Sequence, residues 1–118
     1  MREYQLYING EFVESESKQS FDSINPFNQE IVARVSRANV ADTQKAIQAA
    51  RNVFDNSGWR NISGNERAAM LKAVSDKINE KKKDLEILEV EDSGSTLRKA
   101  KEDVFLSARN MKIGRAHV

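Results

Sequence analysis

The spacing of apolar residues changes near residue 39. Before that point apolar and polar positions alternate, which is typical of strands, whose successive side chains point to opposite faces. Asn9-Gly10 indicates a tight turn because both residues tolerate the positive φ of type I′, and Pro26 indicates a second turn because it lacks an N–H for a ladder. We predict two β-hairpins over residues 4–35, with strands at Tyr4–Ile8 and Glu11–Val13, then at Phe21–Asn25 and Glu30–Val35.

From Asn39 onward the apolar residues recur at steps of three and four, which is the spacing of one helix face. Two capping boxes, Asn39 with Asp42 and Ser63 with Glu66, mark helix starts because each pair can satisfy N–H groups of a first turn. We predict four amphipathic helices within residues 40–111: from Asn39 to near Asn56, from Ser63 through Ile78, from about Lys83 to Glu91, and from Ser95 or Thr96 to Met111. Their apolar stripes are Ile47, Ala50 and Phe54; Ala68, Leu71, Val74 and Ile78; Leu85 and Leu88; and Leu97, Ala100, Val104, Ala108 and Met111.

These elements need a surface to cover. Each helix offers a single apolar stripe, and a two-stranded hairpin buries too little to be stable alone. No run in the sequence reads as the continuous Val- and Ile-rich strands of a central parallel sheet. We infer an α/β fold whose elements pack on a surface that lies outside this chain.

Composition places the chain among ordinary globular proteins and argues against several partners. Of its 118 residues, 39% are hydrophobic and 31% charged, and 19 Lys and Arg against 18 Asp and Glu give a net charge of +1. This balance gives no overall positive electrostatic field that would attract nucleic acid or an anionic membrane. We interpret the run Lys81–Lys83 as a solvated helix face rather than a phosphate contact. We find neither a membrane span nor a signal sequence, so we expect a soluble cytoplasmic protein.

No motif that carries chemistry is present in the sequence. It lacks cysteine and has His117 as its single histidine, which excludes a disulfide, a thiolate nucleophile and a Ser/His/Asp triad within these residues. Glycine-rich phosphate-binding motifs are absent as well. We interpret Trp59 as a packing residue rather than a ligand platform, and Glu66-Arg67 as part of a helix cap rather than a catalytic pair.

The order of these local signals resembles the N-terminal region of the aldehyde dehydrogenase superfamily over nearly the whole chain. Each piece is weak alone, but in this order and at these spacings they form the usual opening of that family. The segments that carry the resemblance are Leu6–Val13, Ile24–Pro26, Glu30–Val35, Ala46–Phe54, Trp59, Glu66-Arg67 and Leu88–Gly94.

The resemblance implies an oxidoreductase that oxidises a small-molecule aldehyde to a carboxylate with NAD or NADP, as a homodimer or homotetramer. Members of the family use a cysteine thiolate, the nucleotide cofactor and a glutamate base. This chain matches none of the family segments that carry the cysteine, the glutamate or the cofactor-binding site. We therefore expect the N-terminal part of an NAD(P)-binding domain, whose helices flank a Rossmann-like sheet that is missing here. Such a chain is a scaffold with no catalytic and no cofactor-binding residue; the alternative is a small self-contained α+β interaction domain without catalysis.

One site of the family can be transferred to this sequence. Many members hold a structural K⁺ or Na⁺ with backbone carbonyls of the second hairpin and the aspartate of a Glu-x-x-Asp-[Ser/Thr]-Gly signature, which match Ser23, Ile24 and Asp92. Carbonyl and carboxylate oxygens suit a hard cation. The alternative is that Asp92 caps the helix beginning near Thr96 or takes part in the turn before it. The signature ends in Gly94-Ser95 where the family commonly has Gly-Lys, which leaves the subfamily open.

The last residues depart from the family pattern. After Met111 the family continues with aromatic residues, whereas residues 112–118 read Lys-Ile-Gly-Arg-Ala-His-Val. The last six can be encoded by ATC GGA AGA GCA CAC GTC, which, after the AG of a lysine codon, is the start of a widely used sequencing adaptor. We therefore assign residues 1–111 to the family segment and 112–118 to a non-native tail from adaptor read-through. Source genomic DNA that encodes residues 112–118 as they stand, with no adaptor, would contradict that assignment.

Overall fold

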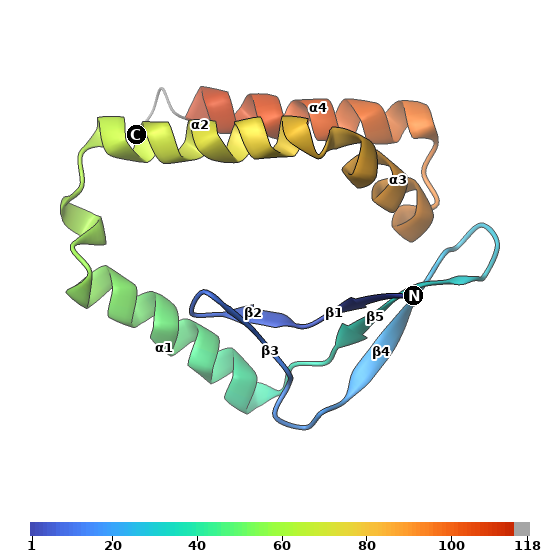
Figure 1. The fold of residues 1–118 in the computed structure, drawn as a ribbon, viewed down its shortest axis with the longest axis horizontal. Helices are drawn as coiled ribbons and strands as arrows, with labels where there is room; N and C mark the ends of the chain where they lie inside the picture. The colour runs from blue at the N-terminus through green and yellow to red at the C-terminus, as the bar shows by residue number, and fades with distance from the viewer. Residues whose placement is uncertain (115–118) are drawn as a thin grey trace. The chain divides into compact units, whose positions relative to one another are not determined.

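The chain forms two compact units in a computed structural model that describes residues 1–114. The first unit spans Met1–Asn61 and contains the strands, the helix α1 (Val40–Asn56) and a short 3-10 helix η1 (Trp59–Asn61) (Figure 1). The second unit begins at Ile62 and contains the helices α2 (Gly64–Glu80), α3 (Lys82–Ser93) and α4 (Leu97–Gly114).

Both predicted hairpins are present in the first unit. The turn of the first hairpin has Asn9 at φ 55° and Gly10 at φ 81°, the positive values that the Asn-Gly signal predicts. In the turn of the second hairpin, the Asn25 side chain accepts the Phe27 N–H at 2.9 Å. The paired strands are β2 (Leu6–Ile8) with β3 (Glu11–Val13), and β4 (Ser20–Ile24) with β5 (Ile31–Ser36).

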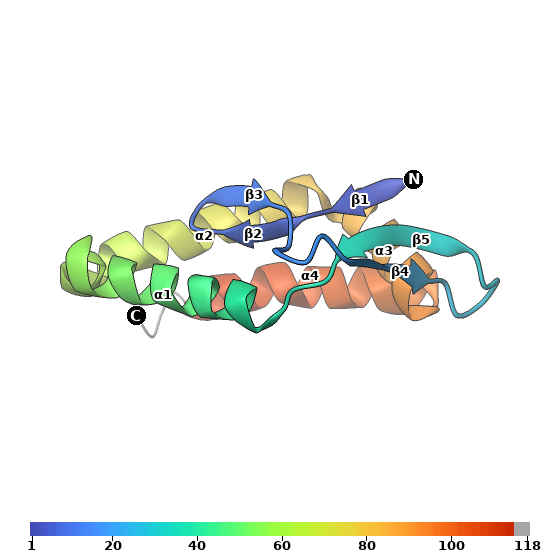
Figure 2. The ribbon, with the colours of Figure 1, turned by 90° about the horizontal axis from the view of Figure 1, so that it is seen from below.

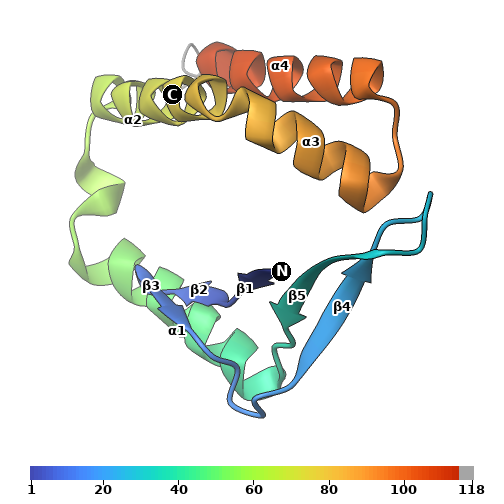
Figure 3. The ribbon, with the colours of Figure 1, turned by 45° about the vertical axis from the view of Figure 1, so that its right-hand side comes forward.

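The N-terminal strand differs from the prediction. Instead of one strand over Tyr4–Ile8, the structure has β1 (Arg2–Tyr4) and β2, separated at Gln5. Strand β1 pairs in parallel with β5 and completes a three-stranded sheet of order β1-β5-β4 (Figure 3). The apolar alternation runs unbroken across Gln5, so it cannot show that the chain changes its pairing partner there.

A buried carboxylate joins the loop before β4 to the start of α1. The predicted capping box is formed, since Asn39 Oδ1 accepts the Asp42 N–H at 3.0 Å and Asp42 Oδ2 accepts the Asn39 N–H at 2.9 Å. Asp42 is only 3% exposed and also accepts the Glu16 N–H, at 3.1 Å. The sequence pattern predicts the capping box of Asp42 with Asn39 and gives no sign of its hydrogen bond to Glu16.

In the second unit α2 and α4 run antiparallel side by side, and α3 packs against α4 (Figures 1 and 2). The predicted stripe of α4 is buried at Ala100, Val104 and Ala108. The fully buried residue of α2 is Ser75, whose Oγ donates to the Ala108 carbonyl at 2.8 Å, whereas Val74 of the predicted stripe is 45% exposed. The other predicted stripe residues of α2, which are Ala68, Leu71 and Ile78, are half-buried, so only Val74 departs from the prediction. A small hydroxyl fits where the alanines of α4 allow the two helices to come close, and its O–H finds an acceptor there.

One helix end and one short element lie outside the prediction. The 3-10 helix η1 follows Gly58, where no regular structure is predicted. Helix α4 continues to Gly114, past the predicted end at Met111, because each added helical residue gains a backbone hydrogen bond. The remaining residues of the predicted tail, 115–118, lie outside the described residues.

The buried apolar core of the described residues is small. Its members are Ala33, Ala100, Val104 and Ala108, whereas a packed domain buries mostly large aliphatic and aromatic side chains. Large apolar side chains are exposed instead, among them Ile47 at 64% and Phe54 at 42% on α1. The predicted stripe of α1 is therefore uncovered, whereas that of α4 is buried at Ala100, Val104 and Ala108.

Candidate functional site

The two predicted carbonyl ligands lie at the end of β4. Ser23 pairs with Ala33 and Ile24 with Ile31, so the register skips Val32 between them. Such an irregularity bends the hairpin and interrupts the regular alternation of the ladder. In the described sheet β4 is an edge strand, so one side of it faces away from β5. Both predicted ligands are thus adjacent, on an edge strand and beside a break in regular pairing.

Asp92 is exposed and is the next-to-last residue of α3. Gly94, at φ 70°, ends the helix and donates its N–H to the Val90 carbonyl at 3.0 Å. At the start of α4, Thr96 Oγ1 accepts the Lys99 N–H at 3.2 Å, so Thr96 supplies the cap that was the alternative role for Asp92. The last turn of α3 has no basic residue, and the C-terminal end of a helix carries partial negative charge. A cation beside Asp92 would relieve this charge.

The structure brings Ser23 and Ile24 together and places Asp92 in the other unit. In that unit Asp92 lines a hollow of about 410 Å³ together with Glu89 and Asp103. No group of three or more His, Cys, Asp or Glu side chains within residues 1–114 is arranged to hold a metal ion. The joint cation site of Ser23, Ile24 and Asp92 therefore stays a prediction.

Shifted pKa values occur at a helix cap and at surface ion pairs. The Ser63 N–H donates to Glu66 Oε2 at 2.7 Å and lowers the pKa of Glu66. On the same helix, the Lys72 ammonium donates to Asp76 Oδ2 at 2.7 Å and lowers the pKa of Asp76. Both hydrogen bonds stabilise the charged form of an exposed carboxylate on α2. The bond from Ser63 supports our interpretation of Glu66 as part of a helix cap.

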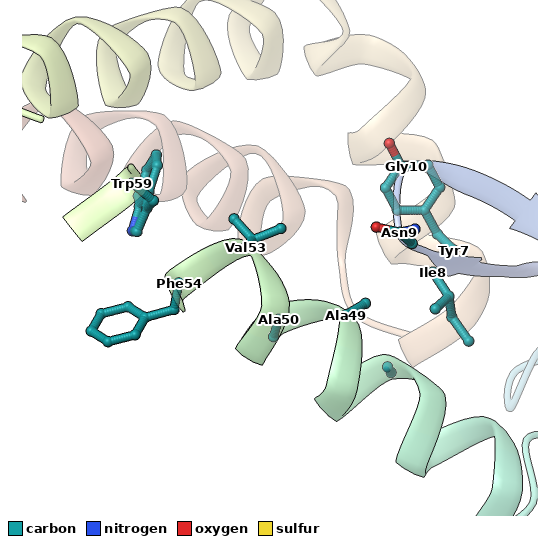
Figure 4. Close-up of a pocket in the computed structure, with 10 residues that line it drawn as sticks. Tyr7, Ile8, Asn9, Gly10, Ala49, Ala50, Val53, Phe54 and Trp59 are labelled. Atoms are coloured by element: carbon teal, nitrogen blue, oxygen red, sulfur yellow. The ribbon is translucent and has the colours of Figure 1, made fainter. Parts of the chain in front are cut away.

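An apolar hollow of about 620 Å³ lies in the first unit between the β2–β3 hairpin and α1. Figure 4 shows Val53, Phe54 and Trp59 along α1 and η1, with Tyr7 and Ile8 across from them. Trp59, predicted as a packing residue, is 42% exposed and lines this hollow. None of the lining residues has a charged side chain; they are Tyr7, Ile8, Asn9, Gly10, Ala46, Ala49, Ala50, Val53, Phe54 and Trp59.

The comparison with known families decides between a family segment and a self-contained interaction domain. The model of the aldehyde dehydrogenase family matches residues 12–116. The chain belongs to the aldehyde dehydrogenase family. The match extends past Met111, where we predict that the family segment ends, and includes residues 112–116. The origin of residues 112–118 from adaptor read-through stays a prediction. No helix within residues 1–114 is long and apolar enough to cross a bilayer.

Individual relatives extend far beyond this chain. Betaine aldehyde dehydrogenase of Bacillus subtilis (strain 168) is 40% identical over 99 residues, which are 84% of this chain and 20% of the relative. Mitochondrial 10-formyltetrahydrofolate dehydrogenase of Homo sapiens is 34% identical over 92 residues, or 78% of this chain and 10% of the relative. The chain thus spans a fifth or less of these curated relatives.

Solved structures of the family share the fold. The crystal structure of an NAD-dependent aldehyde dehydrogenase from Sinorhizobium meliloti matches 98% of this chain and 24% of its own, with a TM-score of 0.94 and 26% identity. A betaine aldehyde dehydrogenase from Staphylococcus aureus in complex with NAD+ matches 95% of this chain and 22% of its own, with a TM-score of 0.92 and 35% identity. The predicted fold, the N-terminal part of an aldehyde dehydrogenase, is confirmed.

Proposed function

We propose that this chain is the N-terminal scaffold of a longer enzyme, which we call the parent enzyme, that oxidises a small-molecule aldehyde to a carboxylate. The supporting observation is a family match over residues 12–116 in a sequence without cysteine. In this chemistry a thiolate adds to the aldehyde carbon, hydride leaves for the nicotinamide, and water releases the acid from the thioester. We assign the thiolate and the base to later segments of the parent enzyme.

NAD+ is the cofactor that we propose, with NADP+ as the alternative. In support, the Sinorhizobium meliloti relative is described as NAD-dependent, and the Staphylococcus aureus structure contains NAD+. The residues of this chain include no glycine-rich phosphate loop, so they do not fit the cofactor. We assign its binding to the rest of the parent enzyme.

We also propose a structural K⁺ or Na⁺ held by the Ser23 and Ile24 carbonyls and the Asp92 carboxylate. The irregular pairing beside Ser23 and the negative helix end at Asp92 support this assignment. The test is the melting temperature of the parent enzyme in KCl, NaCl and choline chloride at equal ionic strength. We expect higher melting temperatures with the small cations and loss of that difference in Asp92→Ala. Equal melting in all three salts would refute the site.

For the assembled parent enzyme we propose a cytoplasmic homodimer or homotetramer that acts on a small molecule without nucleic acid or membrane. The near-neutral charge balance supports the absence of a nucleic-acid partner. Light scattering of the purified parent enzyme measures the assembly, and a monomer would contradict the proposal.

The decisive test of function is NADH formation by the parent enzyme and by this chain, each supplied with NAD+ and a panel of aldehydes including betaine aldehyde. We expect aldehyde-dependent NADH from the parent enzyme and none from the chain. The control is the parent enzyme with its predicted nucleophilic cysteine changed to alanine, which should lose the activity. A parent enzyme that oxidises no aldehyde, or a chain that oxidises one alone, would refute the proposal.

A further inference from the structure

We propose that Asn9 is a modification site, at which spontaneous deamidation converts the Asn9-Gly10 linkage into a β-linked isoaspartate and opens the first hairpin. This covalent chemistry goes beyond the proposed function and does not depend on the activity of the parent enzyme. Three features of the turn support it: an exposed carboxamide, the glycine that follows it, and its place beside the apolar hollow.

The side chain of Asn9 is free to react. Asn9 and Gly10 are both exposed, and they lie between β2 and β3, outside the ladder of the hairpin. Within the described residues 1–114 the Asn9 carboxamide makes no hydrogen bond. In the turn of the second hairpin, by contrast, the Asn28 carboxamide donates to Glu30 Oε2 at 3.0 Å. The turn of the first hairpin therefore leaves its carboxamide unrestrained.

Gly10 removes the steric barrier to the reaction. Deamidation begins when the backbone nitrogen of the following residue attacks the asparagine side chain, and a Cβ on that residue hinders the attack. Asn9 is the single asparagine of the sequence that precedes a glycine. A Cβ added at Gly10 would meet nothing within 4 Å, so the space beside the attacking nitrogen is open.

Water is the sole co-reactant, and no group is oxidised or reduced. The Gly10 nitrogen loses its proton and bonds to the side-chain carbonyl carbon of Asn9. The bond from that carbon to the amide nitrogen breaks, ammonia leaves with the proton, and a five-membered cyclic imide remains. Water then adds to one of the two imide carbonyl carbons and breaks its bond to the Gly10 nitrogen. Attack at the side-chain carbon gives aspartate, and attack at the main-chain carbon gives isoaspartate.

Isoaspartate makes the turn longer by a methylene group, because the main chain then runs through the former side chain. Asn9 at φ 55° and Gly10 at φ 81° form a two-residue turn, and such a turn fixes the register of its strands. That register places Tyr7 opposite Phe12, with ring centroids 5.0 Å apart. A two-stranded ribbon is marginal in water, so we expect the longer turn to separate the two rings.

Both products also place a negative charge beside the hollow of the first unit. Asn9 and Gly10 line this hollow together with Trp59 (Figure 4), and none of the lining residues is charged. A carboxylate there favours water over an apolar surface. Since Trp59 is the single tryptophan of the sequence, its fluorescence reports on the hollow.

The first test follows the loss of each asparagine in the full chain of residues 1–118. Peptide mass spectrometry, with fragmentation that distinguishes isoaspartate from aspartate, locates the products over time. Gly10→Ala adds a Cβ beside the attacking nitrogen. The matched control Gly58→Ala changes another glycine at positive φ, 76°, with open space around it and no asparagine before it.

We expect Asn9 to be lost before every other asparagine. Gly10→Ala should slow this loss about tenfold or more, and Gly58→Ala should change it less than about twofold. Retention of Asn9 while another asparagine is lost would overturn the proposal, as would equal rates in the two variants.

The second test asks whether isoaspartate opens the hairpin. NMR measures the contact between the Tyr7 and Phe12 rings, and fluorescence follows Trp59, in the fresh chain and in the purified isoaspartate form. Freshly prepared Asn9→Asp is the control, because it adds the charge without lengthening the main chain. We expect the ring contact to be lost in the isoaspartate form and kept in Asn9→Asp, with a shift of the Trp59 emission in both. An intact ring contact in the isoaspartate form, or its loss in Asn9→Asp as well, would overturn the proposal.

Discussion

Replacing Asp42 by alanine removes a buried carboxylate that serves two segments. Its oxygens accept the Asn39 N–H at 2.9 Å and the Glu16 N–H at 3.1 Å. Alanine keeps the helical backbone but leaves both donors without this acceptor. We therefore expect the loop of residues 14–19 and the first turn of α1 to loosen together.

The magnitude follows from the two hydrogen bonds that are lost. The Glu16 N–H is shared between the two carboxylate oxygens, at 3.1 and 3.3 Å, so it counts once. Part-buried hydrogen bonds to a charged group contribute about 1.5 kcal/mol each at the low end of their range. The better helix propensity of alanine offsets about 0.5 kcal/mol. The net loss of about 2–3 kcal/mol corresponds to roughly a thirtyfold to 140-fold increase in local opening.

Amide hydrogen exchange of Lys18 and Thr43 measures this opening by NMR. Their acceptors, the Ser15 carbonyl at 3.0 Å and the Asn39 carbonyl at 3.1 Å, are not altered by the substitution. The matched control is Asp55→Ala, which removes the same charge from an exposed ion pair on the same helix and should change both rates less than about twofold. Unchanged exchange in Asp42→Ala, or an equal change in the control, would refute the reasoning.

Three further predictions concern single features of the two units. Ser75→Ala removes the hydrogen bond to Ala108 and should lower the free energy of unfolding of the second unit by about 1 kcal/mol in urea denaturation, and an unchanged midpoint would contradict this. Gly10→Ala should destabilise the first hairpin by about 1 kcal/mol through its positive φ alone, since an added Cβ meets nothing within 4 Å; Gly10→Asn should cost less by NMR hairpin population. Because its folded pKa is lowered from the usual value of 4.5, Glu66 stabilises α2 above that value, and this contribution is lost as the pH falls through the folded pKa. The helicity of a peptide of residues 62–81 should therefore fall on acidification below about pH 5, and less steeply with Ser63→Ala; parallel acid titrations of the two peptides would count against the cap.

Features encoded by neighbouring residues could be predicted from the sequence. The Asn9-Gly10 turn and the capping boxes at Asn39 and Ser63 each depend on residue types within four positions, and the structure contains all three. The α4 stripe could be predicted for the same reason, because helical spacing alone brings Ala100, Val104 and Ala108 to one face.

Features that depend on distant partners could not be predicted. The pairing of β1 with β5 and the bond from Glu16 to Asp42 join segments far apart in sequence, and no local pattern records them. The same holds for Ser75, whose burial depends on the alanines of α4 rather than on its own helix. The cation ligands came from family resemblance, and the structure adds the pairing irregularity beside Ser23.

The central claim is that this chain is the non-catalytic first part of an aldehyde dehydrogenase. The most direct test is to amplify the gene from its source DNA with a primer in the segment encoding α2, and to sequence it beyond codon 111. We expect genomic codons that differ from residues 113–118, in an open frame that continues into family sequence with a cysteine nucleophile and a glutamate base in later segments. A stop codon soon after residue 118, or a long frame without such a cysteine, would contradict the account.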